Sequence, residues 1–331
     1  MIGGMRILVT HSEPGAGLAW RRELAERLPD ARIAIDAATP DGASEPAHAA
    51  GPGFEADWAV GWSPPADLFE RQPRLRAFFS SGAGVDHLLR HPGLPPALPV
   101  VRLEDAGMAT LMADYCLHAL LHIAHRHDEY ARRQAERRWH ELAPIPREAL
   151  PVGIVGMGVL GTRVAGAIAR AGFPVRGFSR GPRRAEGVEG VEGVETMHGA
   201  ARWPDFLAAT RVLVLLAPRT PETEDLIDAA ALARLRPDGW VVNVARGALV
   251  VDADLIAALD SGRLAGAVLD VFREEPLPES HPFWHHPRIR ITPHASAPTQ
   301  VAVSAAQVAA KIAAMARGET PGGLVDRARG Y

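Results

Sequence analysis

Three residues of types that polar catalysis needs follow apolar runs in the second half of the chain: Arg246, Glu275 and His294. In open α/β sheets, ligands bind beyond the carboxyl ends of the strands. A fixed guanidinium holds a carboxylate, and a protonated imidazole gives its proton to a carbonyl oxygen. A carboxylate beside the imidazole favours the charged ring, whose ordinary pKa is ~6.5. Each residue alone is more often structural, but together they suit the reduction of a 2-keto acid.

A glycine-rich turn precedes this set. An apolar run leads into Gly156-Met157-Gly158-Val159-Leu160-Gly161, and a helical pattern follows. Gly156 permits a tight turn, Gly158 lets the backbone approach a pyrophosphate, and Gly161 allows close packing of helix on strand. The helix N-terminus adds a partial positive charge. Such glycines also occur in ordinary strand–helix turns, but the β/α units that follow here favour a dinucleotide site.

The next apolar run, 174–179, ends without the acid that binds the ribose 2′-hydroxyl of NAD. Ser179 and Arg180 stand there instead, with Arg183 close behind. An acid would repel a 2′-phosphate, whereas a hydroxyl donates to it and a guanidinium pairs with it. NADP is therefore the expected cofactor, with NADPH preferred over NADH. The alternative is a solvated basic loop.

The elements that would position these residues form two β/α series. Short apolar runs of the first series lie near 6–10, 32–35, 58–62, 75–80 and 100–101, and those of the second near 151–156, 174–179, 211–216, 240–244 and 265–269. Helical patterns between them predict parallel sheets covered by helices, the doubly wound α/β class. Because 331 residues exceed the size at which one core stops growing, two domains are expected.

The helical patterns predict how the domains are divided. Residues 108–137 are predicted to form one long helix. The last helix, about 298–316, follows all the strands, so we expect it to return to the first domain and make that domain discontinuous. The expected bounds are 1–105 with 297–331 for one domain and 106–296 for the other. Loops are predicted at 36–54 and over the Gly-Val-Glu repeat at 187–195.

Composition excludes several classes of function. A net charge of −3 argues against a nucleic-acid or membrane partner, and no apolar run is long enough for a membrane span. The single cysteine, Cys116, excludes an internal disulfide and suits the cytoplasm. His118, His122 and His125 have spacing that a metal site could use, but no acidic partner pattern accompanies them, so no metal is expected.

In series, the motifs resemble those of the D-isomer-specific 2-hydroxyacid dehydrogenases. They are Gly156-x-Gly158-x-x-Gly161, Asn243-x-x-Arg246-Gly247, Asp270-Val-Phe-x-x-Glu275-Pro276 and Pro293-His294. The resemblance covers nearly the whole chain and is weakest over 1–55. Segments 102–108 and 325–331 are similar to the glyoxylate/hydroxypyruvate reductase A group. The resemblance implies a flavodoxin-like substrate domain and a Rossmann cofactor domain, both doubly wound parallel sheets.

The resemblance also implies roles for single residues. Arg246 would hold the substrate, His294 would donate the proton, Glu275 would tune His294, and Asp270 would bind the nicotinamide carboxamide. The substrate-binding set would be Trp62, Gly82, Ala83, Gly84 and Arg246. The cofactor-binding set would be Gly156, Met157, Gly158, Val159, Leu160, Gly161, Ser179, Arg180, Arg183, Ala217, Pro218, Ala245, Asp270 and His294.

The activity implied is the NADPH-dependent reduction of glyoxylate to glycolate and of hydroxypyruvate to D-glycerate. A homodimer would form through the 108–137 region, and Trp139 resembles a tryptophan that related reductases extend to the partner subunit's site. Two alternatives stay open. One is another D-2-hydroxyacid dehydrogenase that uses NAD, and the other is a non-catalytic NAD(H)-sensing protein of the corepressor kind.

Overall fold

The computed structural model describes residues 4–182 and 192–331. The chain divides into two compact units, one of Met1–Gly107 with Thr299–Tyr331 and one of Met108–Pro298. The expected bounds differ from these by two residues at each junction. Among the described residues, none of the helices combines the length and the apolar character that a membrane crossing requires.

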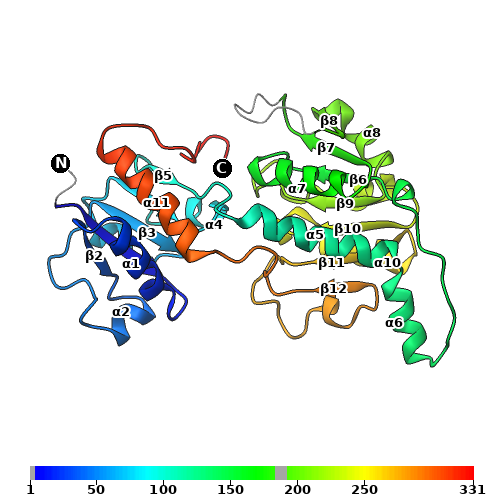
Figure 1. The fold of residues 1–331 in the computed structure, drawn as a ribbon, viewed down its shortest axis with the longest axis horizontal. Helices are drawn as coiled ribbons and strands as arrows, with labels where there is room; N and C mark the ends of the chain where they lie inside the picture. The colour runs from blue at the N-terminus through cyan, green and yellow to red at the C-terminus, as the bar shows by residue number, and fades with distance from the viewer. Residues whose placement is uncertain (1–3, 183–191) are drawn as a thin grey trace. The chain divides into compact units, whose positions relative to one another are not determined.

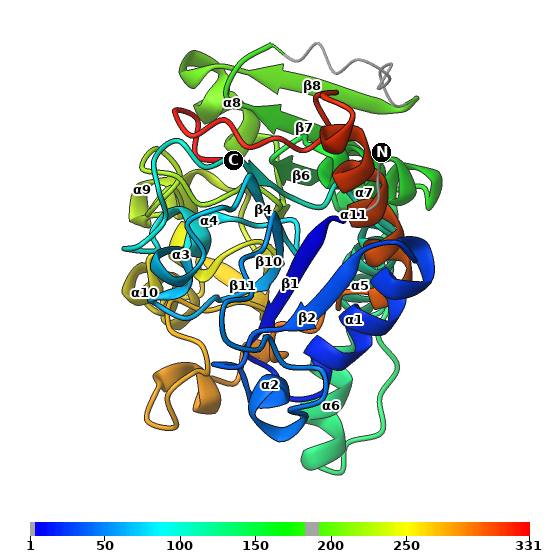
Figure 2. The ribbon, with the colours of Figure 1, turned by 90° about the vertical axis from the view of Figure 1, so that its left-hand side faces the viewer.

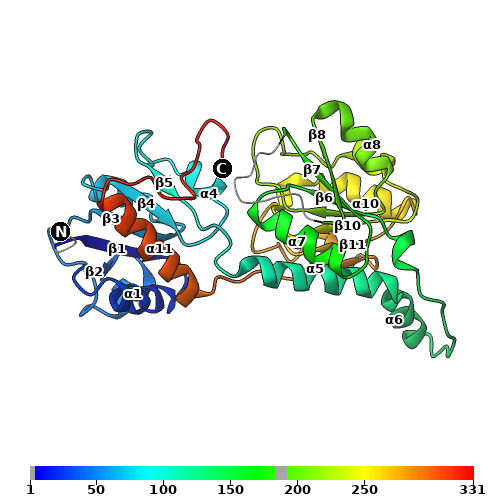
Figure 3. The same cartoon turned by 45° about the horizontal axis from the view of Figure 1, so that its top comes forward.

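The first unit is built on a sheet of five parallel strands, in the order β2-β1-β3-β4-β5 (Figure 3). This is the flavodoxin-like order that the resemblance implies. The strands are β1 (Arg6–His11), β2 (Arg32–Ile35), β3 (Trp58–Trp62), β4 (Ala77–Ser80) and β5 (Val100–Val101).

Helices cover both faces of this sheet. They are α1 (Ala16–Arg27), α2 (Pro40–Ser44), α3 (Leu68–Arg71), α4 (Asp86–Leu89) and α11 (Val301–Ala316). On one face, Leu68 of α3 and Leu88 of α4 join a buried cluster with strand residues such as Phe78. Helices α1 and α11 lie side by side although they are at opposite ends of the sequence (Figures 1 and 2). The first unit is therefore discontinuous, as expected.

The second unit has seven parallel strands in the order β12-β11-β10-β9-β6-β7-β8. Numbered from β6, this is the Rossmann order with one further edge strand. The strands are β6 (Val152–Val155), β7 (Val175–Ser179), β8 (Val194–His198), β9 (Val212–Leu215), β10 (Gly239–Asn243), β11 (Leu264–Leu269) and β12 (Ile289–Ile291).

The two edge strands, β8 and β12, are absent from the sequence-based expectation. Strand β8 is largely exposed, and β12 has one exposed residue between two half-buried isoleucines, so neither carries the continuous apolar run that marks a strand buried on both faces. Strand β8 begins inside the Gly-Val-Glu repeat, so the loop predicted there is wrong at its end. Residues 183–191 of that region lie outside the described residues.

Two layers of helices enclose the second sheet. Helices α5 (Met108–Ala124) and α7 (Val159–Arg170) pack together on one side (Figure 3), where Leu120 and Ile168 share a core with Ile154 of β6. The other core includes residues of α8 (Trp203–Ala208), α9 (Ala229–Arg234) and α10 (Asp252–Asp260). Short 3₁₀ turns lie at Arg147–Ala149, Ala200–Arg202, Gly247–Leu249 and Pro282–His285.

The single helix predicted over 108–137 is wrong. Helix α5 ends at Ala124, and a separate helix α6 (His127–Ala135) follows it. Arg126 between them has φ 57°, a left-handed conformation that ends a helix. Asp128 and Glu129 in the first turn of α6 favour a helix start at this point, because negative charge stabilises a helix N-terminus.

The loop predicted over 36–54 is also wrong in part, because it contains α2. The hydroxyl of Thr39 accepts a hydrogen bond from Gly42 N–H, and Pro40 occupies the first turn. A capping threonine followed by proline is a recognised helix start. At five residues, the helix is too short to show apolar periodicity.

Candidate active site

His294 and Glu275, which are 19 positions apart in the sequence, form a direct pair. Nδ1 of His294 lies 2.7 Å from Oε2 of Glu275. The second carboxylate oxygen accepts a hydrogen bond of 2.8 Å from the N–H of Phe272. Because an ionised carboxylate only accepts, Nδ1 carries the hydrogen of this bond, which leaves Nε2 as the ring nitrogen that can meet a ligand. The His294 side chain is 44% exposed.

Glu275 is held in its ionised form. Burial acts to raise its pKa, but the hydrogen bonds from His294 and from Phe272 N–H act against it. The positive charge of Arg246 acts in the same direction, and the net result is a pKa below the ordinary value. The carboxylate is therefore charged throughout the neutral range.

Arg246 stands in a turn directly after β10. Asn243, at the end of that strand and almost fully buried, closes the turn: its Nδ2 donates to Arg246 O at 2.9 Å and its Oδ1 accepts from Ala245 N–H at 3.1 Å. A Cβ on Gly247 would lie 1.9 Å from the carbonyl carbon of Phe272. Glycine therefore lets the Arg246 turn pack on the segment that carries Glu275.

Asp270, at the end of β11, is fully buried. Its Oδ1 accepts from Thr292 Oγ1 at 2.5 Å and from Ala295 N–H at 2.8 Å, and its Oδ2 accepts from Ser296 N–H at 2.9 Å. All three donors belong to the loop that carries His294. This clamping of the loop is a role that the sequence does not indicate, because it depends on residues more than 20 positions away.

The glycine-rich turn fits a dinucleotide. Gly156 has φ +101°, and a Cβ there would lie 2.5 Å from Ala217 N. A Cβ on Gly161 would lie 1.9 Å from Gly156 O, so helix and strand approach as closely as expected. Helix α7 begins at Val159, and the N–H groups of its first turn have no partner within the helix. The side chain of Met157 is buried against Gly177.

Ser179 and Arg180 occupy the carboxyl end of β7. Ser179 Oγ donates to Gly181 O at 2.9 Å, and Arg180 Nη1 lies 3.4 Å from Glu222 Oε2. Both members of this ion pair are more than half exposed. The sequence does not indicate Glu222, which comes from the loop after β9. Arg183 lies outside the described residues.

In the first unit, the predicted substrate residues form one loop packed on an aromatic ring. A Cβ on Gly82 would lie 2.4 Å from the Trp62 ring, so the ring itself requires glycine there. The N–H of Gly82 donates to Ser80 Oγ at 3.2 Å. Within the described ranges, the N–H groups of Ala83 and Gly84 have no hydrogen-bond acceptor. The ring of His87 lies against that of Trp62, with ring centroids 3.9 Å apart and planes tilted by 40°.

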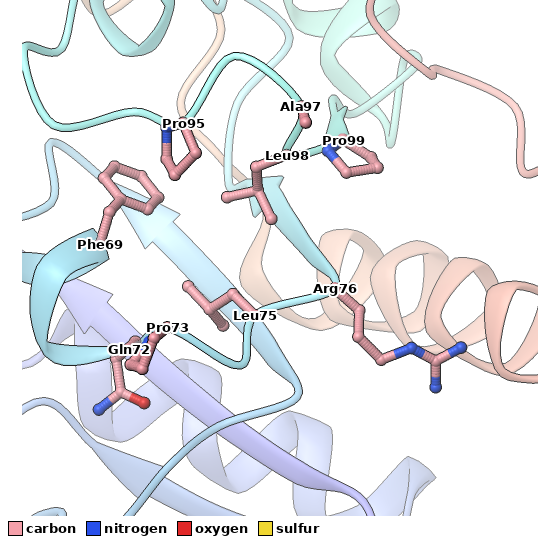
Figure 4. A pocket seen from close by; sticks show the side chains of 9 residues that line it. All are labelled: Phe69, Gln72, Pro73, Leu75, Arg76, Pro95, Ala97, Leu98 and Pro99. Carbon is pink, nitrogen blue, oxygen red and sulfur yellow. The ribbon is translucent and has the colours of Figure 1, made fainter.

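A separate cavity of about 320 Å³ lies elsewhere in the first unit and contains none of the predicted site residues (Figure 4). It is lined by Phe69, Gln72, Pro73, Leu75, Arg76, Pro95, Ala97, Leu98 and Pro99. Among the residues that the structure describes, no group of acidic, histidine or cysteine side chains is arranged to hold a metal ion. The rings of His118 and His122 are 6.4 Å apart.

Comparison with known proteins gives a family match in the second unit. Residues 117–296 match the model described as the NAD binding domain of D-isomer specific 2-hydroxyacid dehydrogenases. A protein named glyoxylate/hydroxypyruvate reductase A from Yersinia enterocolitica is 42% identical over 281 residues, 83% of this chain and 88% of that protein. Its namesake from Serratia proteamaculans is 40% identical over 94% of this chain and 96% of its own length.

Two solved structures are similar over nearly the whole chain. A D-isomer specific 2-hydroxyacid dehydrogenase from Xanthobacter autotrophicus, in complex with NADPH and MES, has a TM-score of 0.89 at 38% identity, with 98% of this chain and 99% of that chain covered. An NADPH-dependent glyoxylate/hydroxypyruvate reductase from Sinorhizobium meliloti, in complex with NADP and sulfate, has a TM-score of 0.88 at 35% identity, with 99% and 100% covered.

Proposed function

Since the chain belongs to the D-isomer-specific 2-hydroxyacid dehydrogenase family, we propose that it reduces small 2-keto acids with NADPH, glyoxylate to glycolate and hydroxypyruvate to D-glycerate. The observation that carries the proposal is the 2.7 Å pair of His294 and Glu275 with the charge of Arg246 acting on it. The names of the relatives and the NADPH and NADP complexes of the similar structures support the substrates and the cofactor.

Each catalytic side chain then has one task. Bound NADPH would supply the hydride for the carbonyl carbon. His294 donates the proton of Nε2 to the carbonyl oxygen, so the product is a hydroxyl on the former carbonyl carbon. Glu275 balances the charge of the ring and fixes its orientation through Nδ1. Arg246 holds the substrate carboxylate with its planar guanidinium.

The remaining roles stay predictions. The second unit would bind NADP through residues 156–161, and the first would bind substrate carboxylate through the N–H groups of Ala83 and Gly84. Trp62 would limit the substrate's size. We retain the homodimer through the 108–137 region and the cytoplasmic location. Trp139 is fully exposed on the segment after α6, which suits contact with a partner subunit.

The proposed activity is tested by following NADPH and NADH oxidation with glyoxylate, hydroxypyruvate and pyruvate. We expect turnover with the first two substrates and a preference for NADPH. Binding of NADPH without oxidation by any 2-keto acid would favour the sensing protein. Faster oxidation of NADH would favour an NAD-using dehydrogenase.

Replacing Arg180 with alanine tests the cofactor preference. Only NADPH carries the 2′-phosphate, so this variant should lose affinity for NADPH and keep its affinity for NADH. A charge-assisted hydrogen bond is worth about 10- to 100-fold in affinity, and the exposure of Arg180 places the loss toward the lower end. The measurement is the Kd of each cofactor from fluorescence titration.

Arg176→Ala is the matched control, because Arg176 lies on β7, the strand that Arg180 directly follows, but pairs with Glu195 at 2.8 Å. It should leave both Kd values unchanged. Equal losses of NADPH and NADH in Arg180→Ala would mean that Arg180 supports the loop and not the phosphate.

Replacing Glu275 with glutamine tests the pairing with His294. The amide keeps the size of the side chain but removes the negative charge that favours the protonated ring. We expect kcat to fall, because the ring of His294 loses the carboxylate that balances its charge. The measurement is kcat with saturating glyoxylate and NADPH, with the exposed neighbour Glu274→Gln as control. An unchanged kcat would remove Glu275 from its assigned role.

A further inference from the structure

The clamp on the His294 loop continues to a helix that the proposed mechanism does not use. The hydroxyl of Tyr115, on α5, lies 2.6 Å from Thr292 Oγ1. Thr292 Oγ1 in turn lies 2.5 Å from Asp270 Oδ1. Tyr115 of α5, Thr292 after β12 and Asp270 after β11 are thus joined in one series of hydrogen bonds. All of them belong to the second unit.

The direction of the hydrogen bonds in this series follows from the number of protons. Thr292 has a single hydroxyl proton, and the ionised carboxylate of Asp270 can only accept, so that proton goes to Asp270. Thr292 must then accept from Tyr115, which is the donor at the start of the series. Burial, followed by the negative charge of Asp270, outweighs the opposing hydrogen bond with Thr292 and raises the pKa of Tyr115 to about 12. Tyr115 is therefore protonated at neutral pH.

The loop that carries His294, at the Asp270 end of this series of hydrogen bonds, has a backbone conformation that needs support from its surroundings. His294 has φ 52°, a left-handed conformation that is unfavourable for a residue other than glycine and persists only where its surroundings enforce it. The N–H of His294 donates to Asp270 O at 2.8 Å, and the next two N–H groups donate to the Asp270 carboxylate. The carboxylate therefore holds the loop on both sides of His294, at Thr292 before it and at Ala295 and Ser296 after it.

Tyr115 is suited to fix the orientation of that carboxylate. Its ring packs against the core shared by α5, α7 and the sheet, so its hydroxyl is held by apolar contacts. Cys116, the next residue, is fully buried in the same core. The tyrosine thus connects a buried core of the unit to the loop that bears the proton donor.

We propose that Tyr115 and Thr292 are positioning residues for reduction, which orient the Asp270 carboxylate and through it the ring of His294. The inference rests on the proposed function, because it says that these hydrogen bonds place His294, the proposed proton donor. Neither residue touches the reacting atoms in this account.

Three variants test the hydrogen bonds that join Tyr115, Thr292 and Asp270. Tyr115→Phe and Thr292→Val each remove one hydroxyl at nearly constant volume, and Thr292→Ser keeps the hydroxyl as the matched control. A hydrogen bond of this kind is worth about 3- to 10-fold, so we expect kcat to fall by that factor in the first two variants. The KM of the keto acid should change by less than about twofold. Thr292→Ser should keep wild-type kcat.

Two combined variants separate positioning from general stability. Because Tyr115 acts through Thr292, adding Tyr115→Phe to Thr292→Val should cost little more than Thr292→Val alone. Because both act through His294, Tyr115→Phe should not lower the residual rate of His294→Ala. A further loss of about 3- to 10-fold in either background would overturn the proposal.

Hydrogen exchange provides a readout that does not depend on activity. The amides of Ala295 and Ser296 should exchange faster in Tyr115→Phe than in the wild type, while the amides of β6 should keep their wild-type rates. Unchanged exchange of both loop amides would contradict the proposal even if the enzyme reduced no 2-keto acid. If the wild type reduces glyoxylate and Tyr115→Phe does so with the same kcat, the positioning role of Tyr115 is contradicted. The proposed function is then left intact.

Discussion

His294→Ala is expected to lose about 100- to 10,000-fold in kcat while NADPH binding is retained, because general acid catalysis typically contributes that factor. In this variant the proton of the carbonyl oxygen must come from water. Glu275, the hydrogen-bond partner of the ring at 2.7 Å, loses in this variant the bond that lowers its pKa, but a glutamate of ordinary pKa (~4.3) is still without a proton at neutral pH. The measurement is single-turnover oxidation of NADPH with saturating glyoxylate.

His285→Ala is the control for this experiment, because His285 is exposed and lies in a turn without a proposed role. It should keep wild-type kcat. Turnover of His294→Ala close to the wild-type rate would remove His294 from the mechanism. Loss of NADPH binding in His294→Ala would instead indicate that the ring supports the cofactor site.

Arg246→Lys is expected to lower kcat/KM by about 100-fold although the positive charge is kept. Lysine cannot form the planar two-donor contact with a carboxylate, and a misplacement of about 1 Å at a reacting centre can cost that factor. The turn that holds Arg246 is closed by Asn243 and packed through Gly247, so the backbone offers little freedom to place a lysine ammonium in the same position. The measurement is saturation kinetics with glyoxylate at fixed NADPH.

Arg317→Lys is the matched control, since Arg317 is exposed and its described ion pair is with Glu319. Its kcat/KM should equal the wild-type value. Unchanged KM and kcat in Arg246→Lys would mean that charge alone suffices at this position. The assignment of a two-donor contact would then be wrong.

Expectation and structure agree best where a residue's own chemistry restricts its position. The strands of both sheets that are buried on two faces were predictable, because a continuous apolar run has no other stable place. The edge strands β8 and β12 were not, since β8 is largely exposed and β12 is only three residues long and half-buried, so no apolar run marks either of them. The break at Arg126 was missed because an arginine seldom adopts φ 57°, and no glycine or proline marks the turn.

The candidate site shows the same division. Residue type and order in the sequence indicated Arg246, Glu275 and His294, because few side chains can hold a carboxylate or donate a proton at neutral pH. The sequence could not give the 2.7 Å distance between the ring of His294 and the carboxylate of Glu275. It also could not show that Nδ1 is the ring nitrogen that makes this contact. Both depend on where the loops after β11 and β12 end.

By itself, the sequence determined the fold class and the kinds of side chain in the site, because apolar periodicity and residue chemistry are local properties. Only the tertiary structure decided how Asp270 is used. The family resemblance implies that it binds the nicotinamide carboxamide, and the folded chain in addition surrounds it with donors from Thr292, Ala295 and Ser296. Likewise, nothing near Tyr115 in the sequence relates it to Thr292, 177 positions away. A buried carboxylate must find hydrogen-bond donors wherever the fold brings them, and those donors are distant in sequence.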